Sequence, residues 1–558
     1  MRTDADLSSQ VRVEKRGLIY DLKKLIGEPV LAAIILIVIG LSGFFVVYPF
    51  SKVVIMPQAT DWMRFFHEER FLTAFQNTFY SSFLATLTAT VFGFIYAYTM
   101  NYVDIPGKKF FRTIVLVPMM APPVVTGIAF IVLFGRRGLI TYSLLHMTTD
   151  LYGWIGLWIV QSMAFFPLAY MTNSGVLKAI SPNLELAAQN LGAHGFKLFR
   201  TVTLPLALPG LLSASLLVAI NSLADFGNPM LIGGDYSVLA TEAYMQVAGQ
   251  WDLKMAAVLS MVLVIPTLIV FFIQKYYLER RSFTTVTGKP VAGLKRVTTS
   301  TMTKWILFSF CCLIVLFICS IFTIVVLAAF TKVFGVNNTF TLNNFIEGII
   351  KSSALKNSWL LAVISAIITT ILGITIAFLI SRKRFPGKNA LDFITLLPAS
   401  LPGTFIGIGL VLAFNQEPIM LTGTGIIIVI AMVMRQLPVG YRNSISAFKQ
   451  IDKSIEEAAT NLGANSFTVI RTIIIPMLKN AMSTSVVYSF MKSMNTLSAV
   501  IFLVSPQWMI GSIAILSFAE QGFIGIASAI AVGMVGIIFI TFGIAKLLLK
   551  DKINIFDI

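Results

Sequence analysis

Apolar stretches of about twenty residues recur along the whole chain, and they constrain its fold more than any other feature. A helix of that length crosses about 30 Å of hydrocarbon. Inside a bilayer the backbone polar groups must be satisfied within the protein, so a spanning segment is a helix or part of a closed barrel. The stretches predict an all-α membrane protein of about twelve transmembrane helices. The predicted spans are 29–50, 71–100, 111–134, 152–176, 206–232, 253–275, 305–331, 357–381, 391–415, 423–446, 480–504 and 520–549.

The composition excludes an ordinary soluble protein. Of the 558 residues, 57% are hydrophobic and only 12% are charged, and the mean hydropathy is +0.84. A soluble chain of this size needs far more charge to cover its surface. The polar, charged start (1–28) is too long for a cleavable signal and precedes an apolar run of span length. We expect it to form a cytosolic N-terminal segment.

The net charge of +17 is explained by membrane topology rather than by nucleic-acid binding. If the N-terminus lies inside, most of the 42 lysines and arginines fall on the cytosolic side. Such an excess of inner basic residues is the usual orientation signal of multi-pass proteins. It predicts that both termini lie in the cytosol.

One unit is written twice in the sequence. Each copy contains six predicted spans. Because six is an even number, each copy ends on the side of the membrane where it began, so the repeats are parallel and are related by an axis along the membrane normal. Residues 77–111 align with 357–391, displaced by 280, and 178–206 align with 449–477, displaced by 271, where 13 of 29 positions are identical. The predicted division is a first transmembrane domain at 29–278, a polar and basic cytosolic linker at 279–304, and a second transmembrane domain at 305–558.

A polar phrase on the cytosolic side also occurs twice. It reads ELAAQNLGAHGFKLFRTVTLP at 185–205 and EEAATNLGANSFTVIRTIIIP at 456–476. Ser181 and Asp452 stand at equivalent N-cap positions ahead of it, and a glycine is placed to end each helix. The pattern predicts a helix roughly 15 Å long in each copy, too short and polar to span the membrane. These helices are expected near 182–192 and 453–463.

Small residues on these helices allow another backbone to approach closely, which leaves two interpretations. The helices are either amphipathic interfacial segments without a partner or docking surfaces. Because the same surface is placed twice on one side, a partner with two-fold symmetry is favoured.

The phrase resembles the EAA loop of ABC importer permeases: Glu-Ala-Ala, then Leu-Gly-Ala, then a proline about a dozen residues later. The resemblance implies the type I, binding-protein-dependent importer fold with both transmembrane domains fused, and it identifies the two helices as coupling helices that dock into a cytosolic ATPase. The implied coupling residues are Glu185, Ala187, Ala188, Leu191, Gly192 and Ala193 in the first copy and Glu457, Ala458, Ala459, Leu462, Gly463 and Ala464 in the second.

The first copy departs from this pattern at one position. Leu186 stands where the motif glutamate belongs, and Glu185 lies one place earlier. A polar contact made by Glu457 is therefore in doubt in the first half.

The sequence contains no phosphate-binding G-x-x-x-x-G-K-[ST] motif, so ATP hydrolysis is assigned to a separate protein. The resemblance implies two copies of a cytosolic ABC ATPase that hold ATP and Mg²⁺, an extracytoplasmic solute-binding protein, and a place in the bacterial plasma (inner) membrane. The chain itself is then a transport subunit, not an enzyme, and has no cofactor of its own.

The cargo is suggested by a second resemblance. The stretches ADFGNPMLIGGDYSVLATEAY and TLSAVIFLVSP are similar to ferric iron importer permeases, which implies ferric iron. Permeases for phosphonate, sugar phosphate and thiamine share the layout and remain alternatives. A secondary transporter with parallel repeats is an alternative of a different class, but it would be expected to use several intramembrane carboxylates. A membrane enzyme would need a catalytic cluster, and none is visible.

Five residues are candidates for the transport pathway. Arg435 and Lys492 are basic and Asp225 is acidic within predicted spans, where charge is costly and is a functional hypothesis by default. They form an internal ion pair or snorkel, or they line the pathway and favour an anionic cargo or an anion-escorted cation. Pro122 and Pro402 break the third span of each half, either to line a cavity or to kink the helix.

No metal site is expected. His67, Glu68 and Glu69 are adjacent residues in an outer loop, which more often are simply solvated. Three cysteines, at 311, 312 and 319, lie in one apolar span, match no metal-binding spacing and are interpreted as small hydrophobic residues.

Overall fold

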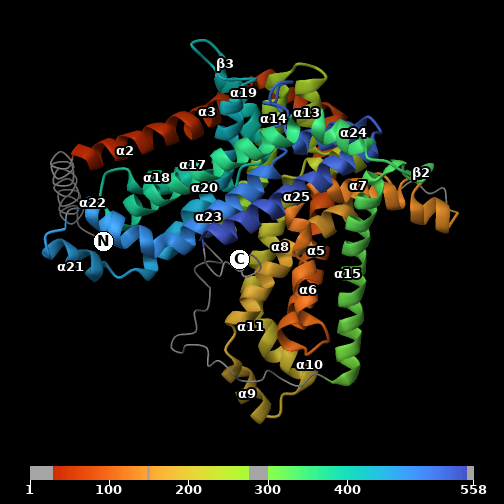
Figure 1. Ribbon diagram of the computed structural model, residues 1–558, viewed down its shortest axis with the longest axis horizontal. Helices are drawn as coiled ribbons and strands as arrows, with labels where there is room; N and C mark the ends of the chain where they lie inside the picture. Colours follow the sequence, from red (N-terminus) through yellow and green to blue (C-terminus); the bar gives the residue numbers. More distant parts are fainter. Residues whose placement is uncertain (1–28, 147–150, 275–299, 465, 550–558) are drawn as a thin grey trace.

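The computed structural model describes residues 29–146, 151–274, 300–464 and 466–549, and these form an almost entirely helical molecule (Figure 1). Within these ranges ten helices are long and apolar enough to span a membrane, or eleven if one sharply bent pair is counted as a span. The predicted N-terminal segment and most of the predicted linker at 279–304 lie outside the described residues. The prediction of an all-α membrane protein made of two repeats is confirmed.

Each half is built around three mutually packed helices. In the first half these are α5 (Glu69–Tyr102), α8 (Trp154–Ala179) and α11 (Leu204–Leu223), and in the second half α17 (Ala354–Arg382), α20 (Gly425–Gln450) and α23 (Ile475–Met494). The same helices therefore recur in the same relationship, as the displaced alignment of the two copies predicts.

Glycines allow the first two helices of each triad to approach closely. A Cβ atom on Gly93 of α5 would lie 2.7 Å from the Cβ atom of Ala169 on α8. At the equivalent crossing, a Cβ atom on Gly373 of α17 would lie 2.9 Å from the carbonyl carbon of Gly440 on α20. Small residues at helix crossings in a membrane maximise van der Waals contact between backbones.

The third span of each half is broken. In the second half, the helical segments Lys388–Ala399 and Gly403–Phe414 (α19) meet at 113°. In the first half, α6 (Lys108–Ile114) and a short 3₁₀ turn precede α7 (Pro123–Phe134). Pro122 and Pro402 precede the first residues of α7 and α19, where a proline removes an N–H and restricts the residue before it. The predicted spans at 111–134 and 391–415 are therefore interrupted rather than continuous.

Two further predicted spans end early. The helix predicted at 206–232 stops at Leu223 and is followed by a short helix, α12 (Gly227–Ile232). The helix predicted at 480–504 stops at Met494. Because α23 carries Lys479 and Lys492 as well as several hydroxyl side chains, it is not among the ten apolar helices, although it packs against α17 and α20 as α11 does against α5 and α8.

The first helix of each half packs against helices of the other half. The segment from α2 (Pro29–Ser42) through α3 (Tyr48–Ile55) packs on α19, where a Cβ atom on Gly409 would lie 3.1 Å from the carbonyl oxygen of Pro49. The helix α15 (Thr301–Ala329), which carries all three cysteines, packs on α5, α6 and α7 (Figure 1). This exchange ties the two halves into one body.

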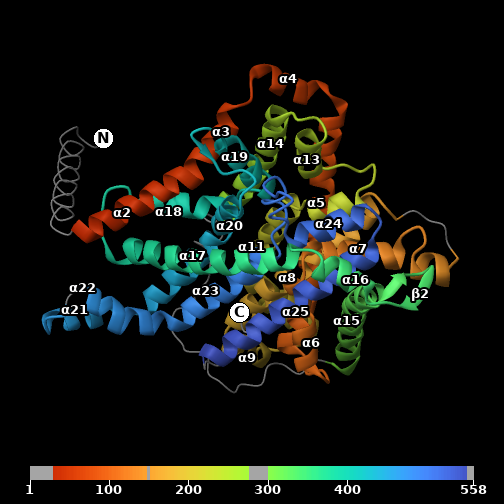
Figure 2. The ribbon, with the colours of Figure 1, turned by 45° about the horizontal axis from the view of Figure 1, so that its top comes forward.

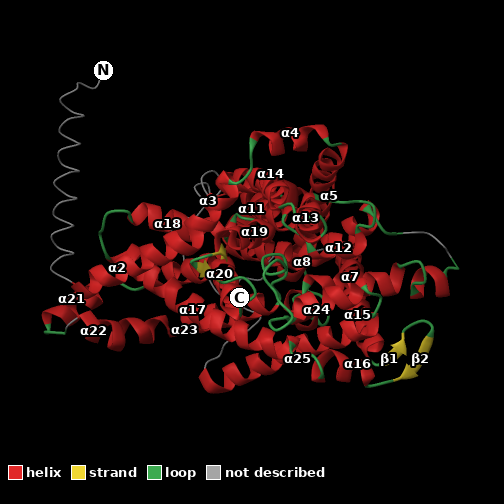
Figure 3. Cartoon of the chain, turned by 90° about the horizontal axis from the view of Figure 1, so that it is seen from above, coloured by secondary structure: helices red, strands yellow, loops and turns green. Residues whose placement is uncertain are grey.

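From the region where the halves meet, two arms diverge (Figures 1 and 2). The arm containing α5, α8 and α11 ends at the short helix α9 (Pro182–Asn190), and the arm containing α17, α20 and α23 ends at α21 (Lys453–Asn461). On the opposite side lie α13 (Leu239–Ala248), α24 (Gly511–Glu520), and two small antiparallel hairpins (Figure 3). The hairpins are β1 (Thr331–Val333) with β2 (Asn337–Phe340) and β3 (Asn415–Gln416) with β4 (Ile419–Met420).

Replacing Gly373 with leucine is expected to force α17 and α20 apart and to destabilise the purified protein by about 1–3 kcal/mol, the usual cost of overpacking. The control is Gly175→Leu on α8, because a Cβ atom there meets nothing within 4 Å. Thermal unfolding in detergent should show a lower Tm for Gly373→Leu alone. Equal Tm values for the two variants would contradict a tight crossing at Gly373.

Candidate functional site

The two short helices α9 and α21 begin as the sequence predicts, although their caps differ. Ser181 precedes α9 in an extended conformation, but its side chain makes no capping hydrogen bond. Asp452 precedes α21, and its Oδ1 accepts a hydrogen bond from the backbone N–H of Ser454 at 3.0 Å. This bond stabilises the charged carboxylate and lowers the pKa of Asp452.

Both helices end in the same turn. The N–H of Ala193 donates to the carbonyl of Ala188 at 3.0 Å, and the N–H of Ala464 donates to that of Ala459 at 3.0 Å. These bonds close around glycines with left-handed backbone angles, φ +84° at 192 and +88° at 463. The turns project two equivalent leucines, Leu191 and Leu462, that are 87% and 89% exposed.

We call each exposed leucine, with the glycine that follows it, a knob. Among the other predicted coupling residues, Ala187 and Ala458 are exposed beside the knobs, whereas the remaining alanines are half-buried against the protein. The half-buried alanines are Ala188, Ala193, Ala459 and Ala464. Each helix thus has one face directed to solvent and one packed on its own arm.

An acidic residue on the inner face fastens each short helix to its arm. Glu185 is 1% exposed, and its Oε1 accepts a hydrogen bond at 2.9 Å from the hydroxyl of Thr203. Glu456 occupies the equivalent position, and its Oε1 lies 2.6 Å from Nε of Arg382. Glu457, the motif glutamate, is exposed, and Leu186 in its place is half-buried. The acid common to both copies is therefore Glu185/Glu456, one residue before the motif position.

Arg382 anchors the second helix through several contacts. It lies at the end of α17 with its side chain 9% exposed. Besides Glu456, its guanidinium donates to the carbonyl of Ile451 at 2.8 Å and lies 5.5 Å from the centre of the Phe448 ring. Tyr102 is the equivalent residue of α5, so the first half lacks this cation. Sequence reasoning missed Arg382, and the repeat gives no signal for it because its equivalent is a tyrosine.

Neutral partners hold the acidic pathway candidate. Asp225 is buried in the break between α11 and α12, and its Oδ2 accepts hydrogen bonds from the side-chain amides of Gln161 at 3.1 Å and Asn228 at 2.9 Å. Within the described part of the chain no ion pair joins Asp225 to Arg435 or Lys492. The ion pair considered from the sequence is therefore not formed in this conformation.

The two basic candidates have different surroundings. Arg435 is half-buried, and its Nη1 donates to the carbonyl of Leu401, in the break ahead of α19, at 2.6 Å. The ammonium group of Lys492 lies 5.8 Å from the centre of the Tyr488 ring. In the first half the break is held instead by Asn495, whose amide donates to the carbonyl of Met120 at 3.2 Å.

The two proline candidates are buried. Pro122 and Pro402 lie beside these breaks, and each is covered by protein. Broken helices are tolerated at membrane depth when the freed backbone groups find protein partners. The carbonyl bonds to Arg435 and Asn495 supply such partners at the two breaks.

The described residues contain no group of three or more His, Cys, Asp or Glu side chains that could hold a metal ion. The sequence FFHEER, predicted to be an outer loop, joins α4 (Ala59–His67) to α5. Nδ1 of His67 lies 2.7 Å from the carbonyl oxygen of Met63, and Glu68 pairs with Arg64 at 2.5 Å. These two side chains are thus engaged locally.

Comparison with known proteins shows where this architecture occurs. A family model described as "Binding-protein-dependent transport system inner membrane component" matches residues 89–283 and again residues 369–553, one match per half. The ferric transport system permease protein FbpB of Actinobacillus pleuropneumoniae is 33% identical over 536 residues, 91% of this chain and 77% of that protein.

A second relative and one solved structure are also similar to this chain. The putative ferric transport system permease protein FbpB 1 of Haemophilus influenzae is 34% identical over 513 residues, 87% of this chain and 79% of the relative. A solved bacterial alginate ABC transporter, in complex with an alginate pentasaccharide-bound periplasmic protein, has a chain aligned over 47% of this chain and 99% of its own length. The TM-score is 0.42 and the identity 19%.

Replacing Arg382 with methionine is expected to release α21, because it removes the ion pair that joins Glu456 to the end of α17. Amide hydrogen exchange within 453–461 should become about 10-fold faster or more, a loss of about 1.4 kcal/mol or more of local stability, while exchange in α9 is unchanged. Arg384→Met is the matched control, since Arg384 is exposed. Unchanged exchange in α21 would show that Arg382 does not anchor it.

Proposed function

This chain belongs to the family of binding-protein-dependent transport system inner membrane components, and on that premise we propose that it is the permease subunit of an ABC importer for ferric iron. The observation that carries the proposal is the pair of matching knobs at the ends of the two arms. Ferric iron is supported by the relatives named as ferric transport permeases, which align over most of this chain and most of their own length.

In this proposal the arms point to the cytosol, as do both termini. The basic residues that orient the spans are then on the inner side. Two copies of a cytosolic ABC ATPase each receive one knob, and Leu191 and Leu462 supply the apolar contact, because exposed leucines at the tips of ordered turns are suited to a hydrophobic cleft. ATP and Mg²⁺ are held by the ATPase, and the permease acts as a transport subunit.

The diverging arms support an alternating-access mechanism. ATP binding closes the ATPase dimer and draws α9 and α21 together, which brings the arms together and opens the opposite side to the solute-binding protein. The movement of each short helix reaches its arm through the inner acids, by Glu185 to Thr203 and by Glu456 to Arg382. Hydrolysis lets the arms separate again and releases the cargo inward.

The cargo pathway is proposed to run between the arms, with Asp225, Arg435 and Lys492 as polar groups along it and the breaks at Pro122 and Pro402 at its outer end. Arg435 and Lys492 are cations, and Asp225 is hydrogen-bonded only to uncharged amides among the contacts described above. These groups favour a solute whose overall charge is negative, so a ferric ion would travel with an anionic escort. The same two cations are the observation that favours an alternative importer of phosphonate or sugar phosphate.

Gly463→Leu is expected to lower ferric iron uptake at least 10-fold and to abolish retention of the ATPase, without loss of membrane insertion. The added side chain would occupy the knob and would strain a left-handed turn by about 1 kcal/mol. Gly335→Leu is the control for retention of the ATPase, because Gly335 has φ +82° and equal free space but lies in the β1–β2 turn, away from the knobs. Normal uptake by Gly463→Leu would contradict the docking role.

Reconstitution tests the cargo directly. Proteoliposomes holding the permease and its ATPase, supplied with ATP and with the solute-binding protein from the same organism, should accumulate labelled ferric iron. They should not accumulate labelled phosphonate, sugar phosphate or thiamine. Uptake driven by an ion gradient in the absence of any ATPase would instead support a secondary transporter and overturn the proposal.

A further inference from the structure

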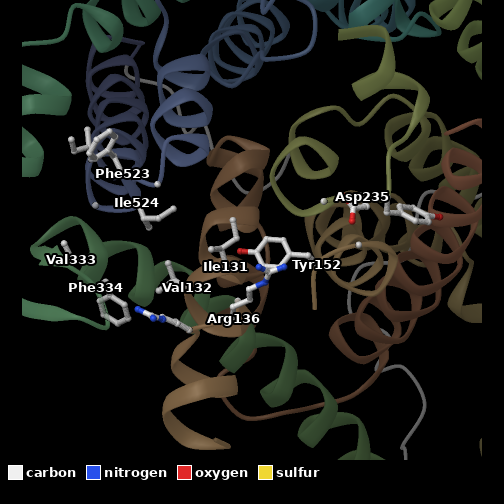
Figure 4. A pocket seen from close by; sticks show the side chains of 18 of the residues that line it. Ile131, Val132, Arg136, Tyr152, Asp235, Val333, Phe334, Phe523 and Ile524 are labelled. Carbon is white, nitrogen blue, oxygen red and sulfur yellow. The ribbon is translucent and has the colours of Figure 1, made fainter. Parts of the chain in front are cut away.

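A large pocket lies at the junction of the two halves (Figure 4). It is lined in part by the β1–β2 hairpin, which lies far from α9 and α21 (Figure 1). Its volume is about 1090 Å³. The end of α7 and the segments around Tyr152 and Asp235 line it from the first half, and the β1 strand and the turn into α25 (Ile524–Leu549) line it from the second. Figure 4 shows Ile131 and Val132 of α7 between Arg136 and Tyr152 on one side and Phe523 on the other.

The rim of this pocket is cationic. Arg136, Arg137 and Lys332 line it and are all exposed, and Asp235 is the one acidic residue among its lining residues. Burial raises the pKa of the lining residue Tyr236 to about 12, so this phenol is neutral at physiological pH. We refer to the three cations and the pocket that they surround as the basic basin.

The opposite half has different chemistry at the equivalent place. At the displacement of 280, the residues that correspond to Arg136 and Arg137 are Gln416 and Glu417 of the β3–β4 hairpin. Within the basin, Asn344 packs directly against Gly525, because a Cβ atom on Gly525 would lie 2.6 Å from the amide nitrogen of Asn344. This contact carries no charge. The outer surface is therefore electrostatically unequal, although the two backbones repeat.

The corresponding contact of the other half is charged. Arg64 corresponds to Asn344, and its guanidinium lies 2.7 Å from Asp252 and 2.5 Å from Glu68. Its cationic charge is thereby neutralised within the protein. Lys332 corresponds to Lys52 at the same displacement, so each half carries a lysine at that place, and the difference between the halves rests on Arg136 and Arg137.

We propose that the basic basin is the docking site for an acidic protruding loop of the solute-binding protein, and that it fixes which lobe of that protein sits over which half. This inference rests on the proposed function, which supplies the partner. The basin combines exposed arginines with tyrosine and phenylalanine side chains. Arginine and aromatic residues are enriched at protein interfaces. Charge complementarity across such a surface sets orientation and speeds association.

A permease made of two fused, similar halves needs a feature that fixes the orientation of its binding protein. Its two outer surfaces share one backbone plan, so a two-lobed partner would meet nearly equivalent shapes in two orientations related by the pseudo-two-fold axis. Like charges placed together disfavour the wrong pairing, since discrimination arises from repulsion as well as attraction. With Arg136 and Arg137 on one side and Gln416 and Glu417 on the other, an acidic loop is attracted more strongly to the half that carries the arginines.

The test is a double charge reversal, Arg137→Glu with Lys332→Glu, in the complete permease–ATPase complex reconstituted in zwitterionic lipid. We expect the concentration of solute-binding protein for half-maximal ATP-driven uptake to rise about 10-fold or more at low salt. The difference should shrink at high salt, where exposed charges are screened. The control is Lys52→Glu with Lys254→Glu, which reverses two lysines that do not line the basin. Retention of the ATPase and an unchanged Tm establish that each variant is folded.

Three results would overturn the inference. An unchanged concentration dependence in the basin variant would do so, as would an equal shift in the control variant, which would indicate a general field over the whole surface. A shift seen only in anionic lipid would assign the basin to lipid headgroups. Since wild-type uptake is measured in the same experiment, failure of the proposed importer function would appear as absent wild-type uptake and is thereby distinguished.

Discussion

Irregular backbone at membrane depth sets the architecture of this molecule, because the carbonyl groups freed at each broken span must be satisfied by protein. The carbonyl of Met120 accepts from Asn495, and that of Leu401 accepts from Arg435. The first of these bonds crosses from one half to the other. Where the halves also meet, a Cβ atom on Gly227 would lie 2.8 Å from Leu497. The breaks therefore form a packed junction, from which the two arms extend (Figure 2).

The parts of the fold that depend on local pattern were predictable. Apolar length located the spans, and Pro122 and Pro402 marked the breaks, because proline acts on its own helix. The exchange of first helices was not predictable, since the contact of α3 with α19 joins segments far apart in sequence and leaves no local signal. The sequence predicted about twelve spans, whereas ten or eleven of the described helices are long and apolar enough to be counted as spans. The difference arises from α23, which is long enough but too polar to be counted.

The candidate site was predicted in its position but not in its internal contacts. Capping residues and a terminal glycine located α9 and α21, and the repeated motif identified their exposed tips. The motif also drew attention to Glu457, whereas the acid that packs against its own arm is Glu456, which is half-buried. Its partner Arg382 lies on another helix, and only folding brings the two together. Asp225 likewise finds neutral partners, although a charge inside a predicted span suggested an ion pair.

Fusion of the two halves in one chain allows equivalent positions to diverge, which identical subunits of a symmetric dimer cannot do. The contacts that join α21 and α9 to their arms illustrate the mechanical consequence. Arg382 links α21 to the end of α17, an earlier helix of its half, through a charged contact. Glu185 links α9 to Thr203, at the entrance to the following helix α11, through a neutral hydroxyl. In the proposed importer, a pull on α21 would therefore reach the earlier helix α17 through an ion pair, and a pull on α9 would reach the following helix α11 through a hydroxyl, so the two arms would be driven through different helices.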